Sequence, residues 1–153
     1  MRIELRRTTW DDPDAIDLRE RQLREIARLY ASEPGAEHRD DSEVIDESTV
    51  LTTVLAYAAG EPIGHAALRR LGDDVEIKRM FVVPERRRTG LAGALLAELE
   101  QTARDVGASR IILHTGDKQA AALGFYRRHA YTPIPVYPPY EAVTYSMCFE
   151  KAL

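Results

Sequence analysis

The sequence predicts an α/β protein built on one mixed, mostly antiparallel β-sheet with helices on both faces. Three observations predict this class. Three β-rich segments joined by short turns follow one another in residues 50–83, as in an antiparallel meander. Segments with an apolar stripe at helical spacing, residues 13–31 and 89–106, flank that meander. A compact apolar strand, residues 110–115, then favours a parallel crossover. The predicted order is β-α-β-β-β-α-β-α-β, in a single domain covering residues 1–153.

The first elements are a strand and a helix. Residues 2–9 alternate apolar and charged side chains, which is the period of a half-buried strand. Asp12 followed by Pro13 is a typical helix start, because aspartate accepts from free N–H groups and proline suits the first turn. Apolar residues recur at helical spacing to about Ala31. The acidic segment 32–48 lacks a sustained period, so we expect a loop with at most a short helical turn.

Three strands and a second helix follow. The strands are residues 50–60, 61–72 and 73–84, and the helix spans residues 89–106 with Gly107 as its stop. Strict alternation in the third strand gives each face its own set of side chains. One face would carry Glu76, Lys78, Met80 and Val82, and the other Ile77, Arg79, Phe81 and Val83.

The last third of the chain adds two strands and a helix. Residues 110–115 follow a strand and a packed helix, so they most simply lie parallel to the third meander strand. Asp117 is the expected cap of a helix over residues 118–129. The proline-rich residues 132–140 lead into a final strand, residues 144–153.

Composition argues against several classes of function. A net charge of −4 argues against a general nucleic-acid binder, which needs an excess of basic residues. The sequence shows neither a signal peptide nor an apolar stretch of about 18 residues, so we expect a cytoplasmic protein that does not enter membranes. Cys148 reads as a buried thiol in a strand rather than a nucleophile. The histidines show no metal-ligand spacing, so no metal is expected.

Residues 82–99, VVPERRRTGLAGALLAEL, run from a strand through three arginines into a helix. A helix N-terminus binds anions, because its first N–H groups are unpaired and it carries the positive end of the helix dipole. Gly90 and Gly93 let the backbone approach phosphate oxygens, and the arginines at 86–88 add charge. The segment has neither the GK[ST] of the P-loop nor G-x-G-x-x-G. We therefore expect a diphosphate held in another way.

Arg87 to Ala92 match R-x-x-G-x-A, and in the context of residues 76–96 and 113–134 the chain resembles the Gcn5-related N-acetyltransferase (GNAT) family. The resemblance extends over residues 50–153, and over the first 49 only in element order. It implies a GNAT-like fold and binding of acetyl-coenzyme A, with the diphosphate on main-chain amides and the pantetheine arm along the preceding strand. Gln119 stands where the family frequently has asparagine. The cofactor-binding residues implied are Val82, Val83, Arg87, Arg88, Thr89, Gly90, Leu91, Ala92, Gly93 and Gln119.

Acetyl transfer needs a neutral amine, a stabilised carbonyl oxygen and a protonated thiolate. The resemblance implies Glu76 as general base, directly or through a water. The alternative is that Glu76 only pairs with a neighbouring basic residue on the sheet. The resemblance also implies Tyr126 as general acid beside the coenzyme sulfur, against the alternative of an ordinary core aromatic. A backbone N–H between Met80 and Val82 would meet the carbonyl oxygen.

Four further residues are open to two interpretations each. Lys78 and Arg79 either hold an acceptor carboxylate or balance the acidic surface. Tyr137 and Tyr140, among the prolines, either line the acceptor pocket or belong to a rigid surface turn.

The predicted function is acetyl-CoA-dependent N-acetyl transfer to a primary amine by direct attack in a ternary complex, since the distant Cys148 offers no acyl-enzyme route. The alternatives are a coenzyme-A-binding sensor or interaction module without turnover, and an arginine-patch nucleic-acid binder. A small-molecule acceptor is favoured because the sequence shows no long charged docking surface. The acceptor's identity stays open. So does a homodimer, which the family commonly forms.

Overall fold

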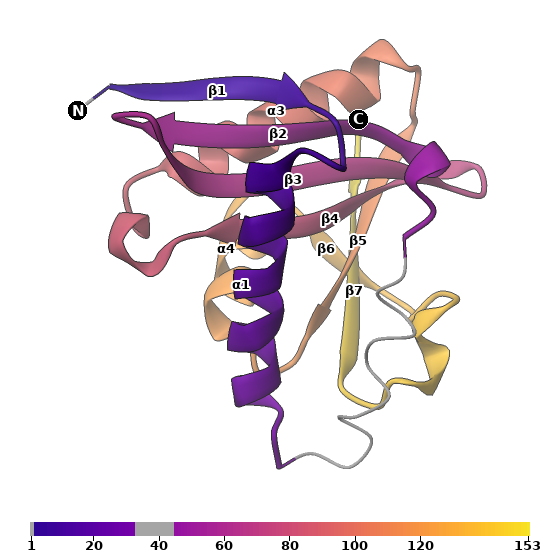
Figure 1. The fold of residues 1–153 in the computed structure, drawn as a ribbon. Coiled ribbons are helices and arrows are strands. Elements are labelled where there is room, and N and C mark those ends of the chain that lie inside the picture. The colour runs from indigo at the N-terminus through magenta and orange to yellow at the C-terminus, as the bar shows by residue number, and fades with distance from the viewer. Residues whose placement is uncertain (1, 33–44) are drawn as a thin grey trace.

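The computed structural model describes residues 2–32 and 45–153, which form one β-sheet with helices packed against it (Figure 1). The strands are β1 (Ile3–Thr8), β2 (Val50–Ala58), β3 (Glu61–Leu71), β4 (Asp74–Val82), β5 (Arg110–Gly116), β6 (Thr132–Ile134) and β7 (Ser146–Ala152). The α-helices are α1 (Pro13–Leu29), α3 (Leu91–Asp105) and α4 (Ala120–Arg128). Most of the segment predicted to be a loop, residues 32–48, lies outside the described residues.

The seven described strands lie in the order β1-β2-β3-β4-β5-β7-β6. Neighbours pair antiparallel except for β4 and β5, which are parallel. The meander of β2, β3 and β4 and the parallel crossover into β5 are thereby confirmed. The parallel ladder is short, because it ends where Ile77 lies opposite Leu113. Beyond this pair β5 and β7 turn away from β4, as Figure 1 shows.

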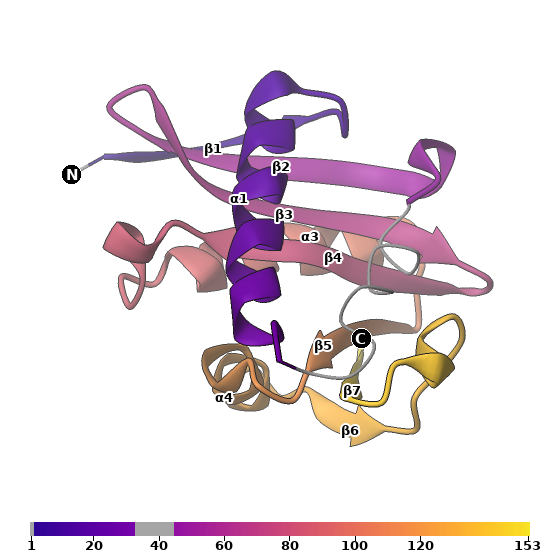
Figure 2. The ribbon, with the colours of Figure 1, turned by 60° about the horizontal axis from the view of Figure 1, so that its bottom comes forward.

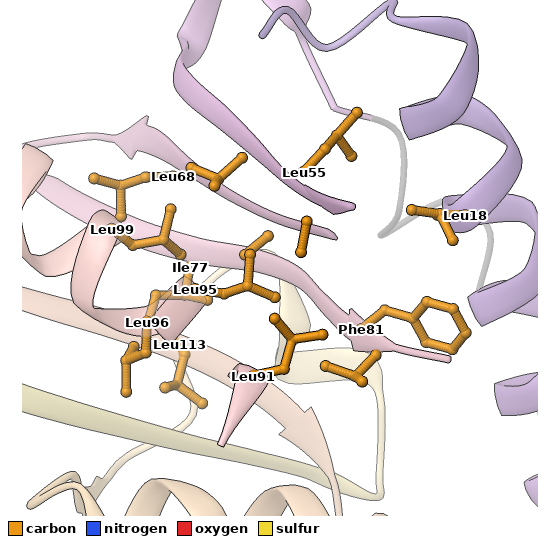
Figure 3. Packing of buried hydrophobic residues seen from close by; sticks show 14 of the residues in the cluster. Leu18, Leu55, Leu68, Ile77, Phe81, Leu91, Leu95, Leu96, Leu99 and Leu113 are labelled. Carbon is orange, nitrogen blue, oxygen red and sulfur yellow. The ribbon is translucent and has the colours of Figure 1, made fainter. Parts of the chain in front are cut away.

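Helices cover both faces of the sheet, as predicted. Figure 2 shows α1 on one face of the strands and α3 on the other. Figure 3 shows the leucines of α3 gathered against the strands, with Leu18 reaching in from α1. The following labelled side chains are all buried: Leu18, Leu55, Leu68, Ile77, Phe81, Leu91, Leu95, Leu96, Leu99 and Leu113. Burial of such side chains is the main stabilising contribution to the fold. None of the described helices has the length and apolar character needed to span a bilayer.

The predicted order contains one strand fewer than the described part of the structure. Residues 132–134 form β6, which pairs antiparallel with β7, with Thr132 opposite Glu150 and Ile134 opposite Cys148. This strand has only three residues and Pro133 stands in its middle. Proline is tolerated in a strand at the edge of a sheet, and β6 is an edge strand. A sequence pattern this short and proline-rich carries no periodic signal.

Two helix boundaries agree with the sequence and one does not. The Asp12 side chain accepts from the Asp14 N–H at the start of α1, and Gly107 follows α3 with a φ of +78°. The third helix does not start at Asp117. The N–H of Asp117 donates to the carbonyl of Tyr145 directly after β5, and α4 begins only at Ala120.

Candidate functional site

The site is centred on the point where β4 and β5 separate. Up to Ile77, β4 pairs with β3 on one side and with β5 on the other. From Lys78 to Val82, β4 keeps only its β3 partner in the described chain. The backbone edge of β4 that faces β5 is therefore open to an extended ligand that pairs like a strand.

A β-bulge interrupts β4 at the start of this open half. Ala67 lies opposite Lys78 and His65 opposite Phe81, so two residues of β4 face Ala66. Arg79, the first of the two, has a φ of +59°. The strict alternation expected along this strand is therefore wrong beyond Lys78, because the extra residue shifts every later side chain by one position.

Backbone carbonyls of the open half are bound by side chains from other elements. The amide of Gln22 on α1 donates to the carbonyl of Met80 at 2.9 Å. The Nε of Arg87 donates to the carbonyl of Val82 at 2.9 Å. These contacts fix the strand where a sheet neighbour is missing.

The turn after β4 leads into the uncapped N-terminus of α3. Gly90 has a φ of +86°, which strains any other residue, and the space where its Cβ would lie is empty to beyond 4 Å. No side chain of the described residues caps this helix, and the N–H groups of Leu91, Ala92 and Gly93 have no acceptor among them. A hollow of about 410 Å³ lies beside the turn, with Thr89, Gly90 and Leu91 in its lining. Open space in front of free N–H groups suits an anion.

The arginines of the turn have different environments. Arg87 donates through one terminal nitrogen to both carboxylate oxygens of Glu25 at 2.9 Å, so it braces the turn against α1. Arg88 is exposed and adopts a φ of +63°. Coenzyme contacts of either guanidinium stay predictions.

Glu76 lies one residue before the β4–β5 ladder ends, and its side chain is wholly buried. Its carboxylate accepts from Arg69 Nε at 2.8 Å, from the Tyr137 hydroxyl at 2.6 Å and from the Tyr140 hydroxyl at 3.3 Å. Burial and the charge of Glu76 raise the pKa of Tyr137, which keeps that hydroxyl protonated. The pairing with a basic neighbour is thus present, and the role of Glu76 as base stays a prediction.

Tyr137 and Tyr140, which the sequence left with two interpretations each, have different environments in the same region. Tyr140 is buried, stacks on His114 with ring centres 3.8 Å apart, and its hydroxyl accepts from Lys78 Nζ at 2.8 Å. Tyr137 is half-buried and lines a hollow of about 490 Å³ over the start of β4 and β5. Tyr140 is therefore part of the interior, whereas Tyr137 faces a pocket. In the described part of the chain, no three His, Cys, Asp or Glu side chains gather as a metal site.

Comparison with known proteins identifies this arrangement. The model of the acetyltransferase (GNAT) family matches residues 14–131. The chain belongs to this family. An IAA acetyltransferase of Azospirillum brasilense is 30% identical over 140 residues, which are 90% of each chain. The expectation of an acyltransferase is confirmed at the level of the family.

Solved structures agree with the GNAT fold. A Klebsiella pneumoniae protein assigned as an acyl-CoA N-acyltransferase aligns with a TM-score of 0.80 at 24% identity, over 99% of this chain and 97% of its own. A PaiA N-acetyltransferase from Thermoplasma acidophilum, solved in complex with coenzyme A, aligns with a TM-score of 0.73 at 20% identity over the whole of both chains. At these identities the likeness shows the fold.

Tyr126, the predicted general acid of this GNAT chain, lies in α4 with 5% of its surface exposed. Its ring contacts Phe125 and Tyr131 edge to face. Burial alone raises its pKa, so the hydroxyl keeps its proton at neutral pH. Gln119 directly precedes α4 and its N–H donates to the carbonyl of Gly116, while its side chain forms no capping bond. The roles of both residues stay predictions.

The GNAT resemblance did not single out the polar residues that fix the β4 bulge. They are Arg19 and Gln22 on α1 and His65 on β3, all buried. Their contacts with β4 or with each other span 14 to 58 residues of sequence. The only local signal was a polar residue on the apolar face of a helix or strand.

Proposed function

We propose that this GNAT chain transfers the acetyl group of acetyl-CoA to a primary amine of a small molecule by direct attack in a ternary complex. The amine nitrogen bonds to the acetyl carbon, the carbon–sulfur bond breaks, the amine loses a proton and the sulfur gains one. One observation carries the proposal. A strand that has left its parallel partner continues through a glycine turn into an uncapped helix start.

The residues present suit the cofactor. The free N–H groups of Leu91, Ala92 and Gly93, with open space at Gly90, would take the diphosphate. The open edge of β4 up to Val82 and the following Val83 would pair with the pantetheine arm. When bound, acetyl-CoA supplies an activated acetyl thioester. This chain's part is to position it, to exclude water and to move two protons.

Proton removal from the amine is assigned to Glu76 through Tyr137. Glu76 is enclosed, and the Tyr137 hydroxyl both donates to it at 2.6 Å and belongs to a residue that lines the 490 Å³ hollow. Tyr137 takes the amine proton as it passes its own to the carboxylate. Tyr126, kept protonated by burial, supplies the proton for the leaving sulfur.

The hollow supports an amine acceptor of modest size. Its volume lies in the range of small-molecule sites. Its charged lining consists of Asp74, Glu150 and Arg110, so carboxylates outnumber cations and favour an ammonium group. The Azospirillum relative and the Klebsiella neighbour are named as transferases of acetyl and acyl groups, which is consistent with the same reaction class.

The test is release of coenzyme A thiol from acetyl-CoA in the presence of pooled small amines. We expect turnover with at least one pool, and a fall of about 100-fold or more in Glu76→Gln, Tyr137→Phe or Tyr126→Phe at unchanged coenzyme affinity. Leu71→Ala, which removes an apolar wall of the hollow, should raise the KM of the amine with little effect on the KM of acetyl-CoA. Tight coenzyme binding without thiol release from any pool would contradict the proposal.

A further inference from the structure

A buried chain of polar contacts runs from the loop before α1 to the β4 bulge. One terminal nitrogen of Arg19 donates to the carbonyl of Trp10 at 2.6 Å, and the guanidinium lies 3.6 Å from the centre of the Trp10 ring. The other terminal nitrogen of Arg19 is 3.0 Å from His65 Nε2. His65 Nδ1 is 2.9 Å from the carbonyl oxygen of Arg79, the bulge residue with positive φ.

The contacts define the state of His65. A guanidinium offers only donors, so His65 Nε2 accepts from Arg19. The ring proton therefore sits on Nδ1, which donates to the Arg79 carbonyl. Burial, together with the positive charges of Arg19 and Arg79, lowers the pKa of His65 to about 3 and keeps the ring neutral. His65 is thus a fixed donor with one orientation.

The neighbouring bulge carbonyl is bound from the same side of the sheet. Gln22 lies one helical turn beyond Arg19 on α1 and donates to Met80, directly after Arg79. Two successive carbonyls of the bulge are therefore held by donors linked to α1. Gln22 belongs to that helix, and His65 is oriented by Arg19 of that helix. Because each peptide unit is planar, orienting a carbonyl also orients the N–H of the next residue. The N–H groups of Met80 and Phe81 are set in this way.

We propose that His65, oriented by Arg19, is a positioning residue for acetyl transfer. It holds the Arg79 peptide in the conformation that directs the N–H of Met80 at the thioester carbonyl oxygen. This inference depends on the proposed function. A non-glycine residue at positive φ relaxes when its partners are removed, so the bulge needs an external donor to stay in register. The hydrophobic core cannot supply that donor.

Three substitutions separate the donor from the bulk of the ring. His65→Leu keeps a similar volume and removes the donor. His65→Asn places an amide N–H near the position of Nδ1, and His65→Gln places it near Nε2. We expect kcat to fall about 10- to 100-fold in His65→Leu and His65→Gln, with the KM for acetyl-CoA changed by less than about 3-fold. His65→Asn should recover most of the loss.

A matched control separates positioning from loss of stability. Leu18→Ala removes buried apolar surface from α1 and none of the hydrogen bonds to the bulge, so it should lower the unfolding temperature and leave kcat per folded molecule unchanged. Hydrogen exchange of the amides of residues 79–82 gives a readout independent of turnover. It should accelerate in His65→Leu and remain slow in His65→Asn and Leu18→Ala.

The outcomes distinguish the two proposals. Turnover by the unaltered enzyme together with an unchanged kcat in His65→Leu would overturn the role of His65 alone. So would equal losses in the folded Leu and Asn variants. An unaltered enzyme that releases no thiol with any amine would overturn the proposed function. In that case slow amide exchange in His65→Leu would also show that His65 does not hold the bulge.

Discussion

The two halves of β4 have opposite environments although they belong to one strand. The first half pairs with strands on both sides from Val75 to Ile77, sends Val75 and Ile77 into the core and encloses Glu76. The second half, Lys78 to Val82, pairs on one side only and contains a bulge. Polar side chains from α1, β3 and the following turn take up its carbonyls.

The difference shows how a sheet can open without losing its order. A regular ladder is stabilised by its neighbours, whereas an interrupted one needs a donor for each released carbonyl. In this molecule one donor comes from α1, which crosses the face of the strands near the opening (Figure 2), one from β3 and one from the turn after β4. The rigid half supplies the support, and the open half supplies the backbone groups that the proposed reaction uses.

The largest effect on stability is expected in the first half, from Glu76→Gln. The substitution leaves the Arg69 guanidinium buried without its carboxylate, which should lower the free energy of unfolding by about 3–5 kcal/mol. Urea unfolding measures it. Replacing both partners, as in Arg69→Met with Glu76→Leu, should recover most of the loss. A change below about 1 kcal/mol in Glu76→Gln would show that the pair does not stabilise this half.

In the second half, the pH dependence of stability should reveal His65. Its folded pKa is about 3 and an unfolded histidine titrates near 6.5, so below pH 6.5 the unfolded chain takes up a proton that the folded chain does not. Stability is then lost as pH falls from about 6.5 towards 3. Between pH 7 and pH 5 the loss from this residue should be about 2 kcal/mol. His65→Asn should lack that part of the slope, and an identical slope in both proteins would contradict a buried neutral ring.

Gln22 offers a smaller and more local test of the second half. Gln22→Glu is isosteric but replaces the donor to the Met80 carbonyl with an acceptor, so it should cost about 1–3 kcal/mol and reduce kcat about 10-fold. Gln22→Met, which is apolar and of similar length, should cost less. Thermal unfolding and steady-state rates measure both. If Gln22→Glu keeps the stability and kcat of the unaltered enzyme, the hydrogen bond to β4 is not what matters at this position.

The smallest effect is expected where β4 ends, at the ion pair of Arg87 with Glu25. Both side chains are partly exposed, so Glu25→Gln should change the free energy of unfolding by no more than about 1 kcal/mol. That change should shrink in high salt. A loss several times larger, measured by urea unfolding, would mean that the turn depends on α1 much more than these contacts indicate.

The sequence predicts most of this fold because its elements carry strong local patterns. The apolar stripes of α1 and α3, the Asp12–Pro13 start and the Gly90 turn all depend on neighbouring residues. The bulge at Arg79 could not be predicted, since arginine rarely adopts positive φ and only the register against β3 reveals it. The same holds for β6, whose three residues include Pro133.

The site was predictable to a similar extent. Gly90 and the free helix start followed from the motif, whereas the role of Glu76, which lies near the opening, stays a prediction. The enclosure of Glu76 could not be foreseen, because Tyr137 and Tyr140 stand more than 60 residues away along the chain. The contacts by which Arg19, Gln22 and His65 hold the bulge could not be predicted for the same reason. Long-range hydrogen bonds leave no periodic trace in a sequence.

The central claim is that the turn at Gly90 binds the diphosphate of the acetyl carrier. Calorimetric titration of coenzyme A into Gly90→Glu tests it most directly, with Gly60→Glu as control. Gly60 also has a positive φ, +79°, and empty space at its Cβ, but it lies in the β2–β3 turn. We predict that Gly90→Glu weakens binding at least about 100-fold, while Gly60→Glu leaves it unchanged. Unchanged affinity in Gly90→Glu would contradict the account.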